Sequence, residues 1–94
     1  MKATMNQRGF RRDYLPTSLA YYEKALHISA NHAGWQTVRC PFHDDKHASL
    51  SVNLEHGGFR CHACGAKGGD ILAFHMRRHD LGFKAAAKEL GAWV

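Results

Sequence analysis

Four residues with metal-binding side chains stand in two close pairs in the middle of the chain. Cys40 and His43 form the first pair and Cys61 and Cys64 the second, with two residues inside each pair. A turn of this length aims two donor atoms at one ion, and two such turns supply four tetrahedral ligands. Three thiolates and one imidazole are typical of a structural zinc site, which has no open position for an activated water. The pattern therefore predicts one structural Zn²⁺ and no catalytic residue.

A disulfide and a redox pair are the alternative uses of these cysteines. The chain has three cysteines, which cannot all pair with one another, and it shows no secretory signal. A redox Cys-x-x-Cys usually begins a helix after a strand, whereas Gly65 and a glycine-bearing loop follow here. A redox pair would also leave Cys40 and His43 without a role, so zinc is favoured. We expect His47 and His62, which are near in sequence, to be exposed and not ligands.

Length and charge limit the possible functions. The chain has 94 residues, which is enough for one small domain that a metal would help to stabilise. Its formal charge is +5 and its pI is about 9.4, and it stays basic when zinc binds three thiolates. A basic domain favours a polyanionic partner such as nucleic acid, although a merely soluble surface would carry the same charge. No apolar run approaches the length of a membrane span, so we expect a soluble cytoplasmic protein.

The chain divides into an arm and a domain. Residues 1–13 are basic and lack apolar periodicity, which predicts a flexible arm. Residues 14–94 are predicted to form the zinc-binding domain, with a ribbon core over about 35–91. Its first helix is expected to begin at Thr17 or Ser18, because either hydroxyl can cap a helix that carries apolar residues at helical spacing.

Three segments are predicted to be strands of one antiparallel sheet: residues 35–39, 49–54 and 58–61. Asp70 is placed to cap a following helix, and Phe83 to Leu90 is predicted to form the last one. The inward side of that last helix is expected to carry Phe83, Ala86, Ala87 and Leu90. The predicted fold class is a small α+β zinc ribbon. It has a short antiparallel sheet with one zinc site, an N-terminal helix and two C-terminal helices.

Longer motifs surround the ligand pairs. They are Val38–Lys46 with the run Cys-Pro-Phe-His, Ser49–Val52, Gly58–Gly65, Gly68–Phe74 with its Gly-Gly-Asp helix start, and Leu81–Leu90. Together they resemble the zinc-binding domain of bacterial-type DNA primases, the DnaG family. The resemblance covers the chain from about Trp35 to Leu90. One departure is Ala48, which stands where the family usually has proline.

The resemblance implies a zinc ribbon with the four ligands named above. It also implies that the domain binds single-stranded DNA template and helps to initiate RNA primers in DNA replication. In the family this module acts beside a Toprim-type polymerase domain, which holds magnesium ions with a set of carboxylates. Asp44 and Asp45 form no such set, and we expect them to be solvated. These residues alone should therefore not polymerise nucleotides, and a polymerase domain or a replicative helicase would act in trans.

Several side chains could contact a single strand, since aromatic rings stack on bases and basic groups bind phosphates. The candidates for contact are Trp35, Arg39, Lys46, Arg60 and Lys67. Phe42 and Phe59 are interleaved with them, but a core position is favoured for both, whereas Trp35 fits either role. Lys67 opens a Lys-Gly-Gly segment that is interpreted as a structural turn.

Three functions therefore remain open. The first is a primase zinc module that recognises template. The second is a stand-alone zinc-ribbon regulator that uses the same surface on duplex DNA or on RNA. The third is a module that docks on another protein of a replication complex. Only the first two predict nucleic-acid binding at physiological salt.

Overall fold

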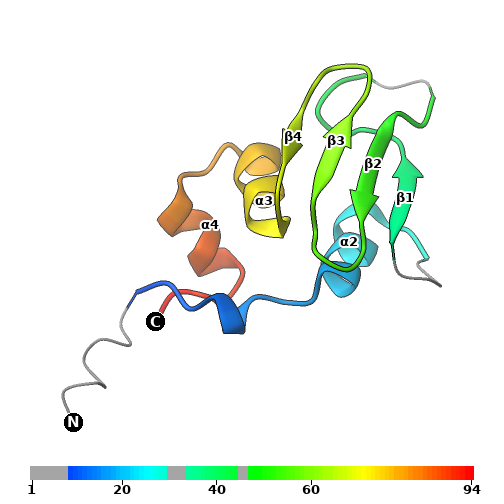
Figure 1. Ribbon diagram of the computed structural model, residues 1–94. Coiled ribbons are helices and arrows are strands. Elements are labelled where there is room, and N and C mark those ends of the chain that lie inside the picture. The colour runs from blue at the N-terminus through cyan, green and yellow to red at the C-terminus, as the bar shows by residue number, and fades with distance from the viewer. Residues whose placement is uncertain (1–8, 30–33, 45–46) are drawn as a thin grey trace, which may run out of the picture.

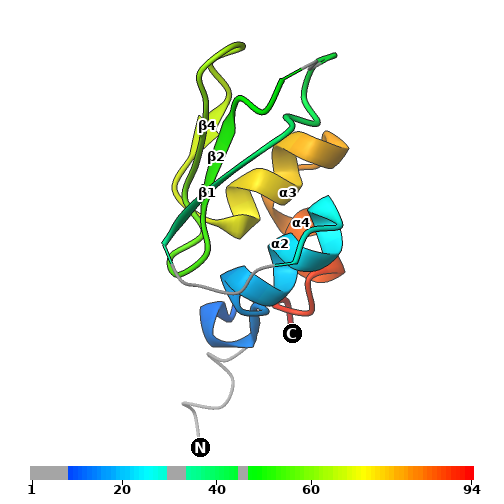
Figure 2. The ribbon, with the colours of Figure 1, turned by 90° about the vertical axis from the view of Figure 1, so that its right-hand side faces the viewer.

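The computed structural model describes residues 9–29, 34–44 and 47–94. Its elements, in chain order, are η1 (Arg12–Tyr14), α2 (Ser18–Leu26), β1 (Trp35–Val38), β2 (Leu50–Asn53), β3 (Phe59–Cys61), β4 (Lys67–Gly68), α3 (Ile71–His79) and α4 (Phe83–Glu89). The four strands form one antiparallel sheet in the order β1-β2-β3-β4. The helices lie behind one face of this sheet and leave the other face open (Figures 1 and 2). The predicted α+β zinc ribbon is confirmed.

The fourth strand was not predicted. Lys67 and Gly68 were interpreted as part of a turn, but they pair with Arg60 and Phe59 of β3. A Cβ atom on Gly68 would lie 2.6 Å from the ring of Phe59 and 2.9 Å from Cβ of Ala73. Glycine is therefore needed here because the chain passes directly over a core ring on its way into α3.

The two longer helices begin where side chains cap them. Thr17 Oγ1 accepts a hydrogen bond from the amide of Ala20 at the start of α2, at 3.2 Å. Asp70 Oδ1 accepts one from the amide of Ala73 at the start of α3, at 2.8 Å. Each oxygen satisfies an amide that has no partner inside its helix, so both predicted starts are confirmed.

The main core lies between the inner face of the sheet and helices α2 and α3. Phe74 of α3 is its centre, with its ring centroid 5.0 Å from that of Tyr22 and 5.1 Å from those of Phe42 and Phe59. Phe59 is buried and Phe42 packs against the same cluster. The expectation that both phenylalanines belong to the core is confirmed, which removes them from the set of candidate base contacts.

The described part of the N-terminal segment is bonded to the C-terminal end. Phe10 and Trp93 form an antiparallel bridge, and Gly9 and Val94 exchange two backbone hydrogen bonds of 2.9 and 3.0 Å. The flexible arm was expected over residues 1–13, and residues 1–8 of it lie outside the described residues. Residues 9–13, by contrast, are held against the domain.

One predicted core residue of α4 is exposed. Ala86 and Ala87 are fully buried against Leu72, as expected, but Phe83 keeps 43% of its surface exposed. Its ring lies 4.9 Å from that of Phe10, in an edge-to-face contact outside the main core. Helical spacing alone did not show that Phe83 packs against Phe10 of the N-terminal segment and lies outside the cluster that buries Ala86 and Ala87. Within the part of the chain that is described, no helix has the length and apolar character to cross a membrane.

Candidate metal centre and outer sheet surface

The four predicted metal ligands meet at one end of the sheet. In Figure 1 the loop after β1 and the loop between β3 and β4 both lie at the top of the sheet. One ligand atom from each of Cys40, His43, Cys61 and Cys64 lies within 4.8 Å of every other. Cys40 Sγ and Cys64 Sγ are 3.8 Å apart. Two thiolates at about 2.3 Å from a tetrahedral Zn²⁺ would be separated by about 3.8 Å, so the site fits zinc closely.

Local backbone bonds orient the sulfur atoms. The amide of Phe42 donates to Cys40 Sγ and the amide of Cys64 donates to Cys61 Sγ, each at 3.4 Å. Gly65 has a φ of +80°, so the chain can turn back and bond its amide to the carbonyl oxygen of Cys61 at 3.0 Å. The two N–H···S bonds, to Cys40 and to Cys61, stabilise these sulfur atoms as thiolates around a metal and fix their direction. Glycine at position 65 thus suits the turn that follows the second ligand pair.

The surroundings of the two buried thiols differ. Burial raises the pKa of the Cys40 thiol to about 12. Burial acts in the same direction on Cys61, but the hydroxyl of Ser49 and the amide of Cys64 outweigh it and lower the pKa of the Cys61 thiol to about 6. Zinc binds each cysteine as a thiolate, so the hydrogen-bond donors around Cys61 favour the form that the metal needs.

The two neighbouring histidines lie outside the cluster. His47 and His62 are exposed, and Nε2 of His62 lies 3.4 Å from Oγ of Ser51 on the open face of the sheet. Both positions agree with the prediction that these side chains are not ligands. The set of three thiolates and one imidazole closes the coordination of a single zinc ion. The chain thus holds one structural Zn²⁺, which ties the end of β1 to the β3–β4 loop.

The open face of the sheet carries a row of polar and basic residues. The strand register places Thr37 opposite Ser51, Ser51 opposite Arg60, and Arg60 opposite Lys67. Arg60 and Lys67 are both exposed, and their neighbours along the strands are buried or half-buried because successive side chains point to opposite faces. Two of the four predicted basic contacts, Arg60 and Lys67, are thereby side by side on one surface.

A shallow hollow of about 500 Å³ lies on the same surface. Its lining residues are Trp35, His56, Gly58, Phe59, Arg60, Lys67, Gly68 and Gly69. Trp35 is 55% exposed, and its ring centroid is 5.6 Å from that of His56. Trp35, whose role the sequence left open, therefore stands at the surface beside Arg60 and Lys67. We call the exposed residues Trp35, His56, Arg60 and Lys67 the outer sheet surface.

His56 was not among the predicted contacts, because it lies between the predicted strands 49–54 and 58–61 and was given no role. Its position beside Trp35 follows from the β1–β2 register, in which Trp35 pairs with Asn53. That register cannot be read from local sequence, so only the pairing could have identified His56. Arg39 is exposed one residue beyond the end of β1. Lys46, the remaining predicted contact, lies outside the described residues.

Comparisons with known proteins agree with this geometry. The family model described as CHC2 zinc finger, a zinc ribbon of the DnaG type, matches residues 22–94. The chain is 36% identical over 66 residues to a DNA primase of Mycolicibacterium smegmatis, which is 68% of this chain and 10% of that protein. It is 43% identical over 51 residues to a DNA primase of Lactococcus lactis, which is 54% of this chain and 8% of that protein.

A smaller relative comes from a virus. The Gene 58 protein of Mycobacterium phage D29 is 33% identical over 58 residues, which is 62% of this chain and 44% of the phage protein. The chain therefore spans about a tenth or less of the two bacterial primases and under half of the phage protein. The family model covers most of the chain and includes all four ligands. On these grounds the chain belongs to the CHC2 zinc-finger family, the zinc ribbons of DNA primases.

Proposed function

We propose that this chain is the template-binding module of a DNA primase. It binds single-stranded DNA on the outer sheet surface and helps to initiate RNA primers. The observation that carries the proposal is the direct pairing of Arg60 with Lys67 across β3 and β4, beside the exposed ring of Trp35. Membership of the primase zinc-ribbon family makes DNA the natural ligand for such a surface.

The paired side chains of Arg60 and Lys67 favour the binding of an anion. Like charges that face each other across an antiparallel pair destabilise the sheet. Among the described residues, neither Arg60 nor Lys67 forms an ion pair with a carboxylate. A phosphate placed between them would relieve their repulsion and gain two charge-assisted hydrogen bonds. Arg39 would extend this contact toward the zinc end, and Lys46 is proposed as a further contact.

The neighbouring aromatic side chains supply the contact to bases. A single strand is held by stacking on aromatic faces together with ionic contacts to its backbone. Trp35 offers an exposed ring, and the ring of His56 lies at 78° to it and closes one side of the hollow. The hollow is shallow and its floor includes Gly58, Gly68 and Gly69, which bring no side chain to block an incoming base. An unpaired base fits this surface better than the stacked bases of a duplex.

The wider primase activity is part of the same proposal. The primases that match are many times longer than this chain. We infer that the chain acts in the cytoplasm. We also infer that a Toprim-type polymerase domain supplies the magnesium chemistry of primer synthesis there. The zinc module would position the template for that domain, and a replicative helicase is the other partner to test.

Fluorescence anisotropy tests the proposal directly. Zinc-loaded protein is titrated against labelled single-stranded DNA and the matched duplex over a series of salt concentrations. We expect tighter binding to the single strand and a fall in affinity as salt rises. Equal or tighter binding to the duplex would favour a stand-alone regulator. No binding at low salt would overturn both and leave a protein-docking module.

A charge-removing variant locates the site. Arg60→Gln should lower the slope of log affinity against log salt by about 0.7, the amount expected for one lost phosphate contact to a single strand. Lys24→Gln is the matched control, because Lys24 is exposed on α2, behind the sheet. An equal effect of the two variants would mean that net charge alone drives binding and would contradict a specific outer surface.

A further inference from the structure

A second group of aromatic and basic residues lies away from the outer sheet surface. It is formed where the antiparallel bridge between Phe10 and Trp93 meets α4. In Figure 1, α4 lies beyond α3, on the side away from the sheet. We call it the terminal surface, and its residues are Phe10, Phe83, Lys84, Lys88 and Trp93.

The rings of the terminal surface are arranged around Phe83. Its centroid is 4.9 Å from that of Phe10 and 6.4 Å from that of Trp93, both in edge-to-face geometry. Phe83 is 43% exposed and Trp93 is half-buried. In an edge-to-face contact the edge of one ring covers part of a face of the other, so the exposed part of Phe83 still presents flat aromatic surface of the kind on which unpaired bases stack.

Two lysines stand beside these rings. Lys84 Nζ lies 5.1 Å from the centroid of the Trp93 ring, and Lys88 follows one helical turn later on the same side of α4. Like charges at this spacing repel each other, and no carboxylate pairs with either lysine among the described residues. The nearby Glu89 is bonded instead to His75 at 2.7 Å. The pair is therefore available to an external anion.

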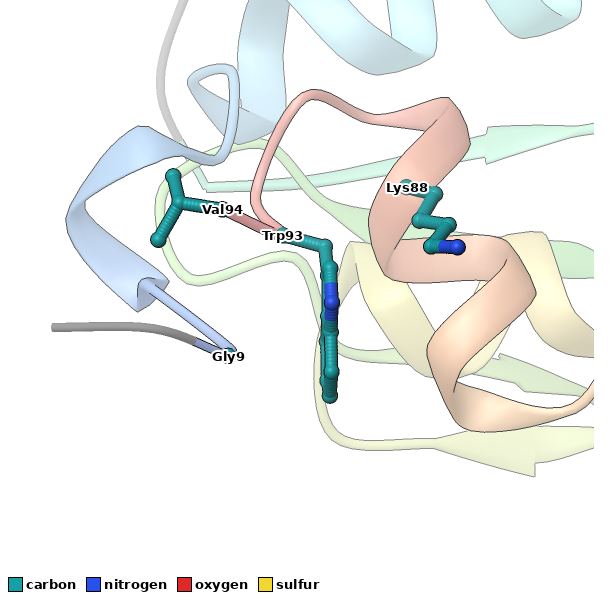
Figure 3. Close-up of a pocket in the computed structure, with 4 residues that line it drawn as sticks. All are labelled: Gly9, Lys88, Trp93 and Val94. Carbon is teal, nitrogen blue, oxygen red and sulfur yellow. The ribbon is translucent and has the colours of Figure 1, made fainter. Parts of the chain in front are cut away.

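A hollow completes the surface. It has a volume of about 610 Å³ and is lined by Gly9, Lys88, Trp93 and Val94. Figure 3 shows the Trp93 ring standing beside α4, with Lys88 above it on the helix and Gly9 and Val94 across the open space. Gly9 contributes no side chain, so one wall of the hollow is bare backbone. A flat group can enter next to the indole while a negative group reaches a lysine.

We propose that the terminal surface is a second binding site for single-stranded nucleic acid. It takes an unpaired base against Trp93 and Phe83 while Lys84 and Lys88 contact the flanking phosphates. This second site rests on the proposed function, in which the outer sheet surface binds the template first, and it adds a further contact to the same strand. Once a strand is held there, its free part reaches the terminal surface in an intramolecular step at high effective concentration.

This arrangement predicts that strand length matters. An oligonucleotide of about 6 nucleotides should be held by the outer sheet surface alone, whereas one of about 24 nucleotides should contact both surfaces. The double variant Lys84→Gln with Lys88→Gln should bind the long strand at least about 5-fold more weakly and the short strand almost unchanged. Its salt slope on the long strand should fall by about 1.4, which corresponds to two lost phosphate contacts.

The matched control removes two charges from another place. Lys24→Gln with Arg78→Gln has the same net charge, and both residues are exposed on α2 and α3. If this control weakens long-strand binding as much as the α4 variant does, or if the α4 variant has no effect, the terminal surface is not a binding site. None of the four side chains changed in these two double variants belongs to a core cluster. We therefore expect both variants to fold, so that their affinities for DNA can be compared directly.

Photo-cross-linking gives an independent readout. A long strand that carries a photoreactive uracil should cross-link to the peptide that contains Trp93, and the short strand should not. Absence of that cross-link with the long strand would overturn the proposal. If the short strand fails to bind but the α4 variant still weakens the long strand, the outer-surface proposal fails and the terminal surface stands. If the short strand binds but the α4 variant binds the long strand as tightly as the unchanged protein does, only the outer sheet surface is supported.

Discussion

The hydroxyl of Tyr22 donates a hydrogen bond of 2.7 Å to the carbonyl oxygen of Gly57. Tyr22 belongs to α2 and is fully buried, whereas Gly57 lies in the tight turn between β2 and β3. The bond joins the N-terminal helix to the end of the sheet that is opposite the zinc site (Figure 1). Burial raises the pKa of the Tyr22 hydroxyl, so this hydroxyl stays protonated and remains a donor.

Tyr22→Phe should therefore destabilise the zinc-loaded protein. The change removes one oxygen and leaves the buried carbonyl of Gly57 without this donor, which costs about 1–3 kcal/mol. Urea unfolding followed by circular dichroism measures the loss. Tyr14→Phe is the matched control, because Tyr14 is 49% exposed and should tolerate the change. Equal stability of the two variants would show that the buried bond contributes nothing.

Gly57 is also constrained by its backbone. Its φ is +86°, and a Cβ atom there would lie 2.8 Å from Oγ of Ser18 and 2.9 Å from the backbone nitrogen of Ile71. Gly34 has a similar φ of +97°, but among the described residues no atom lies within 4 Å of the added Cβ. Gly34→Ala should thus cost only the conformational strain, about 1–2 kcal/mol. Gly57→Ala should cost clearly more, because helices α2 and α3 must move away, and urea unfolding of the pair tests this difference. Similar losses would mean that strain alone matters.

The parts of the fold that were predictable rest on local chemistry. The ligand pairs, the caps at Thr17 and Asp70 and the alternation in β2 are each visible within a few residues of sequence. The contacts that were missed depend on pairing between distant segments. The edge strand β4 has two residues, and its position over Phe59 follows from the tertiary fold.

The functional surfaces divide in the same way. Arg60 and Lys67 were candidates because basic residues are visible in the sequence, but their direct pairing required the β3–β4 register. His56 was missed because a turn residue acquires its neighbour Trp35 only through the sheet. Phe83 was placed in the core because the period of α4 cannot show that Phe10 returns to pack against it. Sequence patterns thus identify the chemical groups, and long-range pairing decides which of them share a surface.

Loss of one zinc ligand should abolish the metal site. Cys61→Ser should reduce the zinc content from about one ion per chain to near zero and unfold the central sheet, because zinc contributes on the order of 10 kcal/mol in small modules. Plasma mass spectrometry of dialysed protein and far-ultraviolet circular dichroism measure both effects. His62→Ala is the control, since His62 is the adjacent residue but is exposed on the open face. Loss of zinc from the His62 variant would contradict the assigned ligand set.

Trp35→Ala should weaken binding of single-stranded DNA without destabilising the fold. A base stacked on an aromatic ring contributes about 1–3 kcal/mol, so affinity should fall about 5- to 150-fold. The side chain is 55% exposed and lies on β1 at the edge of the sheet, so its removal opens no cavity in the core. Tyr14→Ala removes a comparably exposed ring from η1 and should leave the affinity unchanged. Anisotropy titrations of both variants decide the matter, and unchanged binding by Trp35→Ala would mean that bases do not stack on the outer sheet surface.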